Sequence, residues 1–462
     1  MMLWLVILLG IQSCSSIVIR INPIVIVKYV RNDTSGDFSR FTTGPDPNAP
    51  PGVTKYSVKY LDINSSTGKF LVNKRYGSNL FWWFFPSERN SSSDPVIVWL
   101  QGQPNTSCLH GLFDEHGPYA IDPLSKAIVK REHRWTKEFN VLYLDLCTSC
   151  GYSYSGHPKG YSLSLEAVAK NLVRALHMFF STYRNLVKND LYLSGESMSG
   201  QYMFVVAHGI HNSNPMTPVQ LNFKGLLIGN GFMDSRQLAE YRENLFRIGI
   251  LPLKVYDDMY TKLPSIESSI LTGDYNRAIS LWNKHYYSAI REAGYNSMYD
   301  VRDTNAFWNS LVPQVATSKQ IRQLLQVGNR TFNVPHNCAY FIGEVFKPTI
   351  SILAEVLNQY KVLFYTGQFD MLVPYIHTAN FLDYLGWKGV TGFYSSRHNA
   401  WMMNGTLVGY WKTYRSLTHV LIRNAGHMVG ASQPEYLFEM VKRFVNDDGS
   451  DPKRFKRADK DV

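Results

Sequence analysis

Short, almost uninterrupted runs of apolar residues recur along the chain. They cover 96–100, 141–146, 191–193, 225–228, 362–365 and 420–422. Strands that are apolar on both faces are typical of a mostly parallel sheet with helices on both sides. Between the runs, apolar positions recur at helical spacing, most clearly in 165–183. This alternation predicts an α/β fold with a doubly wound central sheet.

Two regions depart from the alternation. The segments 56–63, 69–76 and 80–86 are rich in β-branched and aromatic residues and are separated by turn signals, so they predict antiparallel strands at the sheet edge. The region 233–346 is rich in Tyr, Asn, Ser and Arg and has helical but no strong strand patterns. We expect it to form a helical cap over the carboxyl ends of the strands, inserted into a core of 17–232 and 347–462.

The first 16 residues are typical of a signal peptide. An apolar stretch, 3–11, leads into Gln-Ser-Cys-Ser-Ser, and it is shorter than the roughly 20 residues that a membrane span requires. The next apolar run, 17–30, is interrupted by Arg20, Pro23 and Lys28, which favours a propeptide or an N-terminal strand. No later segment is expected to span a membrane. We therefore expect a secreted or lysosomal protein of the secretory pathway.

Two further features fit that compartment. Six Asn-x-Ser/Thr sequons are candidate glycosylation sites, at Asn32, Asn64, Asn90, Asn105, Asn329 and Asn404. Of the five cysteines, Cys14 falls in the predicted signal peptide, which leaves an even number. Sequence does not fix their pairing, but we favour Cys108 with Cys338 and Cys147 with Cys150. A redox-active Cys-x-x-Cys is the alternative, although no thioredoxin-like unit surrounds it.

The net charge of +11 does not point to nucleic acid. Apart from 453–457 in a polar tail, the basic residues are scattered, and no helix-turn-helix, zinc-finger or aromatic-basic RNA motif is present. We expect a solvated tail with at most weak attraction to acidic surfaces. No metal or cofactor motif is apparent either.

Candidate chemistry lies where three buried strands end. Ser197 stands at a strand-to-helix bend between Gly195 and Ser199, as in a nucleophile elbow, although an ordinary turn can have the same composition. An elbow serine requires an acid and then a histidine later in the chain. Asp370 follows the strand 362–365 and His427 follows 420–422, which is the required order. The three residues are therefore a candidate catalytic triad.

These motifs resemble those of the serine carboxypeptidases, most nearly the vitellogenic-like branch. The segment 195–200 is similar to the family's Gly-Glu-Ser-Tyr-Ala-Gly, 365–370 to its Tyr-Asn-Gly-Gln-Leu-Asp, and 425–429 with Gln433-Pro434 to its histidine motif. The segments 76–86, 99–102, 111–118 and 327–332 also match. The resemblance implies an α/β-hydrolase fold, with the 233–346 region as its cap, and peptidase activity.

The resemblance also implies roles for the triad. Ser197 would attack the scissile carbonyl, His427 would take its proton and pass it to the leaving amine, and Asp370 would orient the imidazolium. Backbone N–H groups of Gln103 and Met198 would form the oxyanion hole.

By the same resemblance, Gln101, Glu115 and Glu196 would bind the terminal carboxylate of the substrate. A carboxylic acid that faces a carboxylate has a raised pKa, so this arrangement favours binding at acidic pH. Without the resemblance, Glu115 would suit a cap and Glu196 a helix start, where an acid complements the helix dipole.

Three loops depart from the family pattern. Gly102-Gln-Pro-Asn105 replaces Gly-Gly-Pro-Gly, and an oxyanion hole distorted at Gln103 would cost about 10²–10³ in turnover. A glycan on Asn105 would crowd the cleft. Cys147-Thr-Ser-Cys-Gly151 replaces Pro-Val-Gly-Thr-Gly, and Gly430 stands where proline is usual.

The sequence thus predicts a serine carboxypeptidase that releases C-terminal amino acids from peptides or proteins through an acyl-enzyme, without metal or cofactor. The first alternative is a weakened or inactive homologue that acts as a secreted binding protein, which the altered glycine loop would favour. The second is an esterase or acyltransferase on the same fold.

Overall fold

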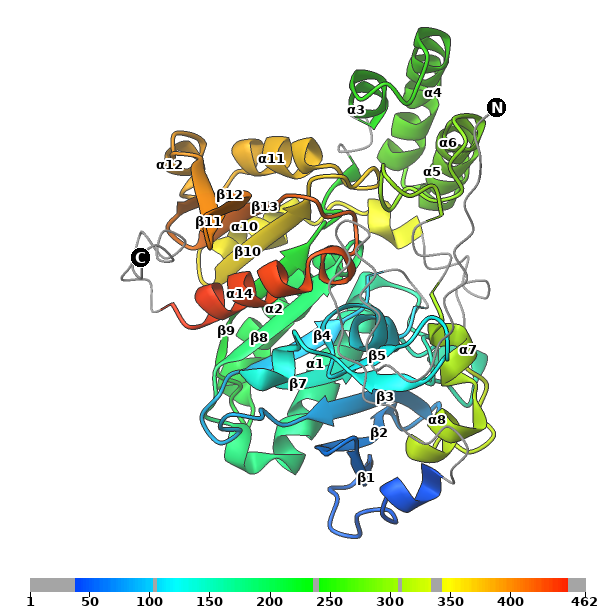
Figure 1. Ribbon diagram of the computed structural model, residues 1–462, viewed down its shortest axis with the longest axis vertical. Coiled ribbons are helices and arrows are strands. Elements are labelled where there is room, and N and C mark those ends of the chain that lie inside the picture. Colours follow the sequence, from blue (N-terminus) through cyan, green and yellow to red (C-terminus); the bar gives the residue numbers. More distant parts are fainter. Residues whose placement is uncertain (1–37, 103–105, 236–240, 306–309, 334–342, 448–462) are drawn as a thin grey trace, which may run out of the picture.

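The computed structural model describes residues 38–102, 106–235, 241–305, 310–333 and 343–447. Their centre is an 11-stranded sheet in the order β1-β2-β3-β7-β4-β8-β9-β10-β13-β12-β11 (Figure 1). Its strands are β1 (Val53–Tyr60), β2 (Ile63–Asn73), β3 (Ser78–Phe85), β4 (Val96–Leu100), β7 (Asn140–Leu144), β8 (Leu191–Glu196), β9 (Phe223–Gly229), β10 (Lys361–Gly367), β11 (Asn399–Met403), β12 (Thr406–Tyr414) and β13 (Leu417–Ile422). The short strands β5 (Tyr119–Ile121) and β6 (Ile128–Lys130) form a separate pair.

The inner strands are parallel and the outer strands are antiparallel. Six neighbouring strands pair in parallel, in the order β7, β4, β8, β9, β10 and β13. The strands β1, β2 and β3 at one edge and β11 and β12 at the other pair antiparallel. The predicted α/β fold and its antiparallel edge are therefore confirmed.

Two local predictions at the sheet edges are wrong. The expected strand 56–63 breaks at Leu61 and Asp62, whose φ angles of 49° and 59° make a two-residue turn between β1 and β2. The expected strand 69–76 is the second half of β2, which ends at Asn73. The β11–β12 hairpin was not predicted, although Asn404-Gly405 at its turn is a strong hairpin signal.

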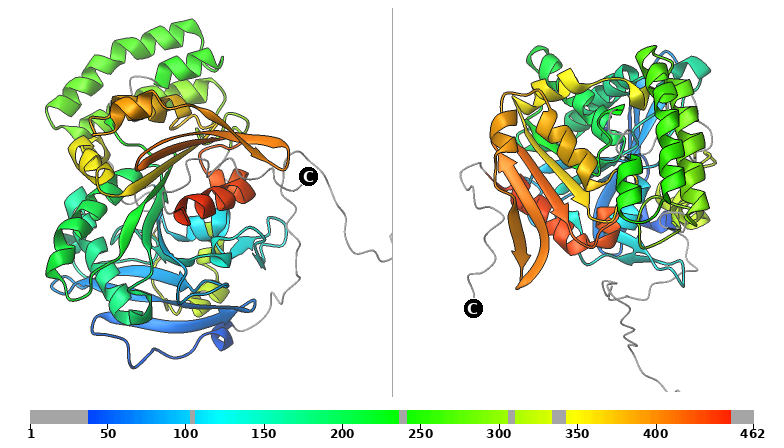
Figure 2. Two further views of the ribbon diagram at one scale, coloured as in Figure 1. Left: turned by 90° about the vertical axis from the view of Figure 1, so that its left-hand side faces the viewer. Right: turned by 90° about the horizontal axis from the view of Figure 1, so that it is seen from above.

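Helices cover both faces of the sheet (Figure 2). In chain order they are α1 (Leu165–Thr182), α2 (Ser199–Ser213), α3 (Tyr241–Arg247), α4 (Leu253–Leu271), α5 (Tyr275–Trp282), α6 (Ser288–Glu292), α7 (Val312–Ala316), α8 (Lys319–Leu324), α10 (Ile350–Leu357), α11 (Tyr375–Tyr384), α12 (Val390–Tyr394), α13 (Val429–Ser432) and α14 (Pro434–Val445). Within the described ranges, no helix is both long and apolar enough to cross a membrane.

The strand β3 shows why both faces need a cover. Leu80, Trp82 and Phe84 point into a core shared with α1, α2, α10, α11 and α12, and the alternate residues 81, 83 and 85 point into a core shared with α14. Since successive side chains of a strand point to opposite faces, a strand that is apolar throughout needs both layers.

The region 233–346 has two separate parts. Helices α3 to α6 form their own apolar cluster at one end of the molecule, which also includes Met371 and Val373 (Figure 1). Helices α7 and α8 lie against the core, where the Ala316 and Leu324 carbonyls accept hydrogen bonds from Tyr152 and Thr42 at 2.6 and 2.9 Å. The helices α3 to α6 thus contact the loop that follows β10.

Candidate active site

Five neighbouring parallel strands bring polar groups to one edge of the sheet. In spatial order β4, β8, β9, β10 and β13 are followed by Gln101, Ser197, Asn230, Asp370 and His427. The carboxyl ends of parallel strands are where α/β sheets bind ligands. Residues from five separate segments therefore gather in one site.

Ser197 lies at a sharp bend between β8 and α2. Its φ of 55° is in the left-handed region, and its N–H donates to the Gly229 carbonyl at 2.8 Å. A Cβ on Gly195 would lie 2.4 Å from the Leu100 carbonyl oxygen and 2.3 Å from Ser199 Oγ. The bend thus requires glycine at 195, as a nucleophile elbow does. Ser197 itself is 8% exposed.

Gly102 allows the loop after β4 to approach this bend. A Cβ on Gly102 would lie 2.1 Å from the Glu196 carbonyl oxygen and 2.8 Å from Ser197 Cβ. The loop is also fixed by Asp145, whose Oδ1 accepts from the Ser107 hydroxyl at 2.9 Å and from the Cys108 N–H at 3.0 Å. Burial raises the pKa of Asp145 to about 6, against these hydrogen bonds, which lower it.

Asp370 and His427 form a buried pair. The Nδ1 atom of His427 lies 2.7 Å from Oδ2 of Asp370, and the two residues are 1% and 3% exposed. Oδ1 of Asp370 accepts from the backbone N–H groups of Leu372 and Val373, at 2.7 and 3.1 Å. Because Nδ1 faces the carboxylate, Nε2 is the nitrogen left to accept a proton; it is buried and lacks a hydrogen-bond partner within the described residues.

The site contains a residue that sequence reasoning missed. Asn230 Nδ2 donates to Oδ2 of Asp370, and its Oδ1 accepts from the Gly367 N–H at 3.2 Å. Its φ of 42° is a conformation that asparagine tolerates better than most residues. The available signal was a polar residue between two glycines directly after the buried strand 225–228.

Gln101, Glu115 and Glu196, the candidate group for binding a terminal carboxylate, lie together next to the bend. Gln101 Nε2 donates to Oε1 of Glu196 at 2.6 Å, while Gln101 Oε1 accepts from Trp99 Nε1 at 2.8 Å and from the Gly111 N–H at 2.9 Å. The accepted bonds fix the orientation of the Gln101 amide, so that its NH₂ faces Glu196.

The two glutamates are buried with perturbed pKa values. Burial raises the pKa of Glu115 to about 8, with a contribution from the nearby Asp114 charge. Burial, the Glu115 charge and the Asp370 charge raise the pKa of Glu196 well above its ordinary range. A carboxyl group with a raised pKa keeps its proton, and its O–H can donate a hydrogen bond to a carboxylate.

Gly430 makes room for this pair. A Cβ on Gly430 would lie 2.7 Å from Glu115 Cβ and 3.1 Å from Leu437, a space in which no larger residue fits without moving Glu115. The unusual glycine in the histidine loop is thus matched to the position of Glu115.

Several predicted residues lie away from this centre or outside the described residues. Four of them lie outside the described residues: Asn32, Gln103, Asn105 and Cys338. Met198 follows Ser197 and immediately precedes α2.

Cys147 and Cys150 form the predicted disulfide, and Cys108 is buried. Asn64, Asn90, Asn329 and Asn404 are exposed.

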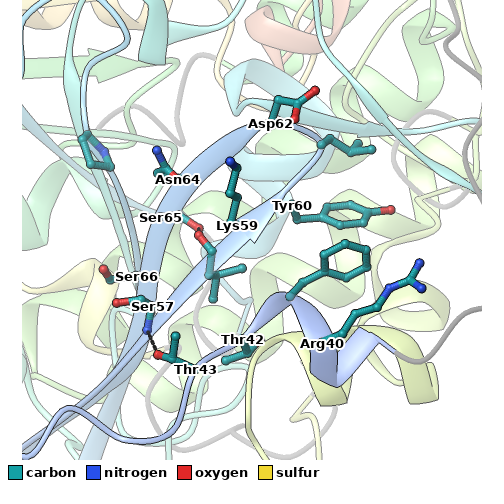
Figure 3. Close-up of a pocket in the computed structure, with 14 residues that line it drawn as sticks. Arg40, Thr42, Thr43, Ser57, Lys59, Tyr60, Asp62, Asn64, Ser65 and Ser66 are labelled. Carbon is teal, nitrogen blue, oxygen red and sulfur yellow. Dashed lines mark hydrogen bonds between the residues drawn. The ribbon is translucent and has the colours of Figure 1, made fainter.

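A separate groove of about 790 Å³ lies at the β1 edge of the sheet (Figure 3). It is lined by β1, the start of β2 and the segment around Arg40 to Thr43, with Lys59, Asp62 and Asn64 among its polar residues. No residue of the candidate triad lines it. In the described part of the chain, no group of His, Cys, Asp and Glu could hold a metal ion.

The fold and the elbow define the class of the protein as an α/β hydrolase. A family model described as serine carboxypeptidase matches residues 51–447. The chain belongs to the serine carboxypeptidase family and is a serine-type carboxypeptidase.

Its relatives span most of its length. The chain is 32% identical over 409 residues to the venom serine carboxypeptidase of Apis mellifera, covering 84% of this chain and 85% of that one. It is 30% identical over 399 residues to the vitellogenic carboxypeptidase of Aedes aegypti, covering 83% and 84%. Among solved structures, Kex1Δp, a prohormone-processing carboxypeptidase from Saccharomyces cerevisiae, matches with a TM-score of 0.71 at 20% identity, covering 83% of this chain and 92% of that one. This last likeness concerns the fold.

Proposed function

We propose that the enzyme releases C-terminal amino acids from peptides through an acyl-enzyme on Ser197. His427 Nε2 accepts the Ser197 proton as Oγ attacks the scissile carbonyl, then donates it to the leaving amine. Water then attacks the ester with the same histidine as base. Asp370 holds the ring through Nδ1 and stabilises the imidazolium, which its 2.7 Å contact supports.

The contact between Ser197 and His427 has to tighten during the reaction. Nε2 has no hydrogen-bond partner within the described residues, so the hydroxyl is not yet bonded to it. Catalytic hydrogen bonds are often long in unliganded enzymes and shorten when substrate binds. The N–H of Met198, at the start of α2, is the proposed donor to the oxyanion, with Gln103 as its partner.

The observation that carries exopeptidase specificity is the cluster of Gln101, Glu115 and Glu196 beside the elbow. Its protonated acids and the Gln101 amide can donate to a free carboxylate, whereas an internal peptide bond offers no such group. Because Glu115 loses its proton as the pH rises through about 8, we propose that binding is strong at acidic pH and weakens above about 8.

The test compares N-blocked dipeptides that differ only at the carboxyl end. The enzyme is expected to hydrolyse the free acid at about pH 5 and to act poorly on the C-terminal amide. Glu196→Gln supplies a matched variant, expected to raise KM for the free acid more than for an ester substrate. Equal rates on acid and amide would overturn the assignment of this cluster.

We further propose that the protein enters the secretory pathway and is secreted or lysosomal. The predicted signal peptide, the Cys147–Cys150 disulfide and four exposed sequons support this proposal. A relative named as a venom carboxypeptidase points the same way. Expression of the full chain in animal cells, with assay of the medium and the lysosomal fraction, tests it; activity only in the cytosol would contradict it.

A further inference from the structure

A short segment of the predicted cap, residues 297–302, contacts the loops that carry both Asp370 and His427. We call it the strap. It follows α6 in the chain, and residues 297 and 298 are buried.

The strap contacts the acid loop on both sides of Asp370. The Met298 carbonyl accepts from the Met371 N–H at 3.2 Å, and the Val301 N–H donates to the Phe369 carbonyl at 2.9 Å. The two residues adjacent to the catalytic acid are therefore both held by the strap. The side chain of Asp370 is held separately, by Asn230 at Oδ2 and by the Leu372 and Val373 N–H groups at Oδ1.

The strap also holds the histidine. The Tyr299 carbonyl accepts from the backbone N–H of His427 at 2.6 Å, and the Tyr299 ring packs edge-to-face on the imidazole, with 4.7 Å between ring centroids and planes at 87°. Edge-to-face packing constrains the ring as well as the backbone. One residue of the strap thus orients both parts of His427.

An ion pair fixes the strap itself. Arg302 donates from Nε to Oδ1 of Asp300 at 2.9 Å and from Nη2 to Oδ2 at 2.6 Å, a bidentate pair. The same guanidinium lies 4.6 Å from the Phe369 ring centroid and donates to the Asn424 carbonyl at 3.3 Å. Arg302 therefore bridges the strap, the acid loop and the histidine loop.

Gly426 shows how closely the strap fits. A Cβ there would lie 2.5 Å from Oδ2 of Asp300 and 2.6 Å from the Tyr299 carbonyl oxygen. Only glycine beside His427 lets the strap approach, so movement of the strap is transmitted to the histidine loop.

We propose that the strap, fixed by Asp300 and Arg302, is a positioning element that sets the placement of His427 relative to Asp370 and Ser197. The proposal rests on the proposed triad. The loops also contact each other directly, through Phe369 N–H to the Ala425 carbonyl at 2.8 Å, but that bond joins residues before the catalytic pair. The strap, in contrast, bonds the peptide groups on either side of Asp370 and the backbone N–H of His427 itself.

The experiment compares Arg302→Gln and Arg302→Lys with a control in another bidentate pair. Arg134 and Glu88 form such a pair, with an Nε to Oε1 distance of 2.7 Å, and neither residue contacts the triad loops. Since a misplacement of about 1 Å can cost about 10²-fold in rate, we expect Arg302→Gln to lower kcat about 10- to 100-fold, with a smaller change in KM. Arg302→Lys should recover part of the loss, because one hydrogen bond to Asp300 can form.

A second readout does not depend on peptide binding. The rate at which diisopropyl fluorophosphate labels the serine should fall in parallel with kcat in Arg302→Gln and stay near wild type in Arg134→Gln. If Arg302→Gln does not fold, Asp300→Asn makes a smaller change and should show the same pattern to a lesser degree.

The outcomes separate the two proposals. If wild type is active and folded Arg302→Gln matches Arg134→Gln in kcat and labelling, the strap proposal is wrong while the triad stands. If wild type neither cleaves the peptide nor reacts with the label, the triad proposal fails and the strap proposal falls with it.

Discussion

Asn230 donates a hydrogen bond to Oδ2 of Asp370, the same oxygen that lies 2.7 Å from Nδ1 of His427. Asparagine and histidine thus meet at one carboxylate oxygen, while two backbone N–H groups bind the other. The carboxylate cannot rotate without breaking several of these bonds. Asn230 therefore fixes the direction from which Asp370 holds the imidazole.

Removing the Asn230 side chain should impair turnover more than folding. Because a misplacement of about 1 Å can cost about 10²-fold in rate, loss of this hydrogen bond in Asn230→Gly should lower kcat/KM about 10- to 100-fold. Glycine tolerates the φ of 42° at this position, whereas Asn230→Ala adds backbone strain. Kinetics and thermal unfolding of both variants should therefore show similar losses of activity but lower stability for alanine. Wild-type kcat/KM in Asn230→Gly would show that the bond is dispensable.

The elbow predicts a steric effect at Gly195. Gly195→Ala would place a methyl group against the Leu100 carbonyl and the Ser199 hydroxyl, and overpacking of this kind costs about 1–3 kcal/mol. Denaturant unfolding should detect that loss, together with reduced activity. Gly386→Ala is the matched control, because Gly386 is exposed and its added Cβ would meet nothing within 4 Å. Equal stabilities of the two variants would contradict the tight bend.

Substrate binding should weaken as the pH rises through the pKa of Glu115. Below about 8 its carboxyl group is protonated and can donate to the substrate carboxylate; above it, two like charges face each other. KM for a free-acid dipeptide should therefore rise with pH. Glu115→Gln keeps a donor without a charge, so the rise should be smaller, and an unchanged pH profile in this variant would exclude Glu115 from binding.

The same shift has a consequence for stability. The folded-state pKa of Glu115 is raised from 4.5 to about 8, so its contribution to the free energy of unfolding is fully present below pH 4.5 and is lost as the pH rises through 8. Urea unfolding at several pH values should show a steeper decline for wild type than for Glu115→Gln. Parallel curves would argue against a raised pKa.

Four sequons are predicted to carry glycans. Asn64, Asn90, Asn329 and Asn404 are exposed, so the transferase can reach them. Each Asn→Gln variant expressed in animal cells should gain mobility on a denaturing gel, and digestion with a glycosidase should remove the difference. A variant with unchanged mobility would mark an unused sequon.

The residues of the candidate triad could be proposed from the sequence because their signals are local. The bend at Ser197 and the strand ends at Asp370 and His427 are each encoded within about ten residues, and the fold brings them together. Asn230 and the strap could not be found in the same way. The role of Asn230 depends on its contact with Asp370, 140 positions away. The role of the strap depends on contacts with residues 369, 371 and 427, which are also far from it in the sequence. Neither a lone asparagine nor Tyr299 has a local pattern that marks such contacts.

The hairpin at Asn404-Gly405 was a different kind of miss. Its turn signal is local, but β11 and β12 follow α12 at the sheet edge, where a half-exposed strand lacks the continuous apolar run that identified the inner strands. The end of β1 was misplaced because the apolar and polar residues around Leu61-Asp62 also fit an uninterrupted strand, so the pattern did not reveal the turn.

The most direct test measures release of the terminal amino acid from an N-blocked dipeptide at about pH 5 and near neutrality, by purified wild type and Ser197→Ala. Wild type is expected to release the amino acid strongly at acidic pH, and this release should disappear in the variant and on the C-terminally amidated peptide. Release by wild type no faster than by the folded variant would show that Ser197 does not act as the nucleophile on these substrates, and would leave a binding protein as the better interpretation of this chain.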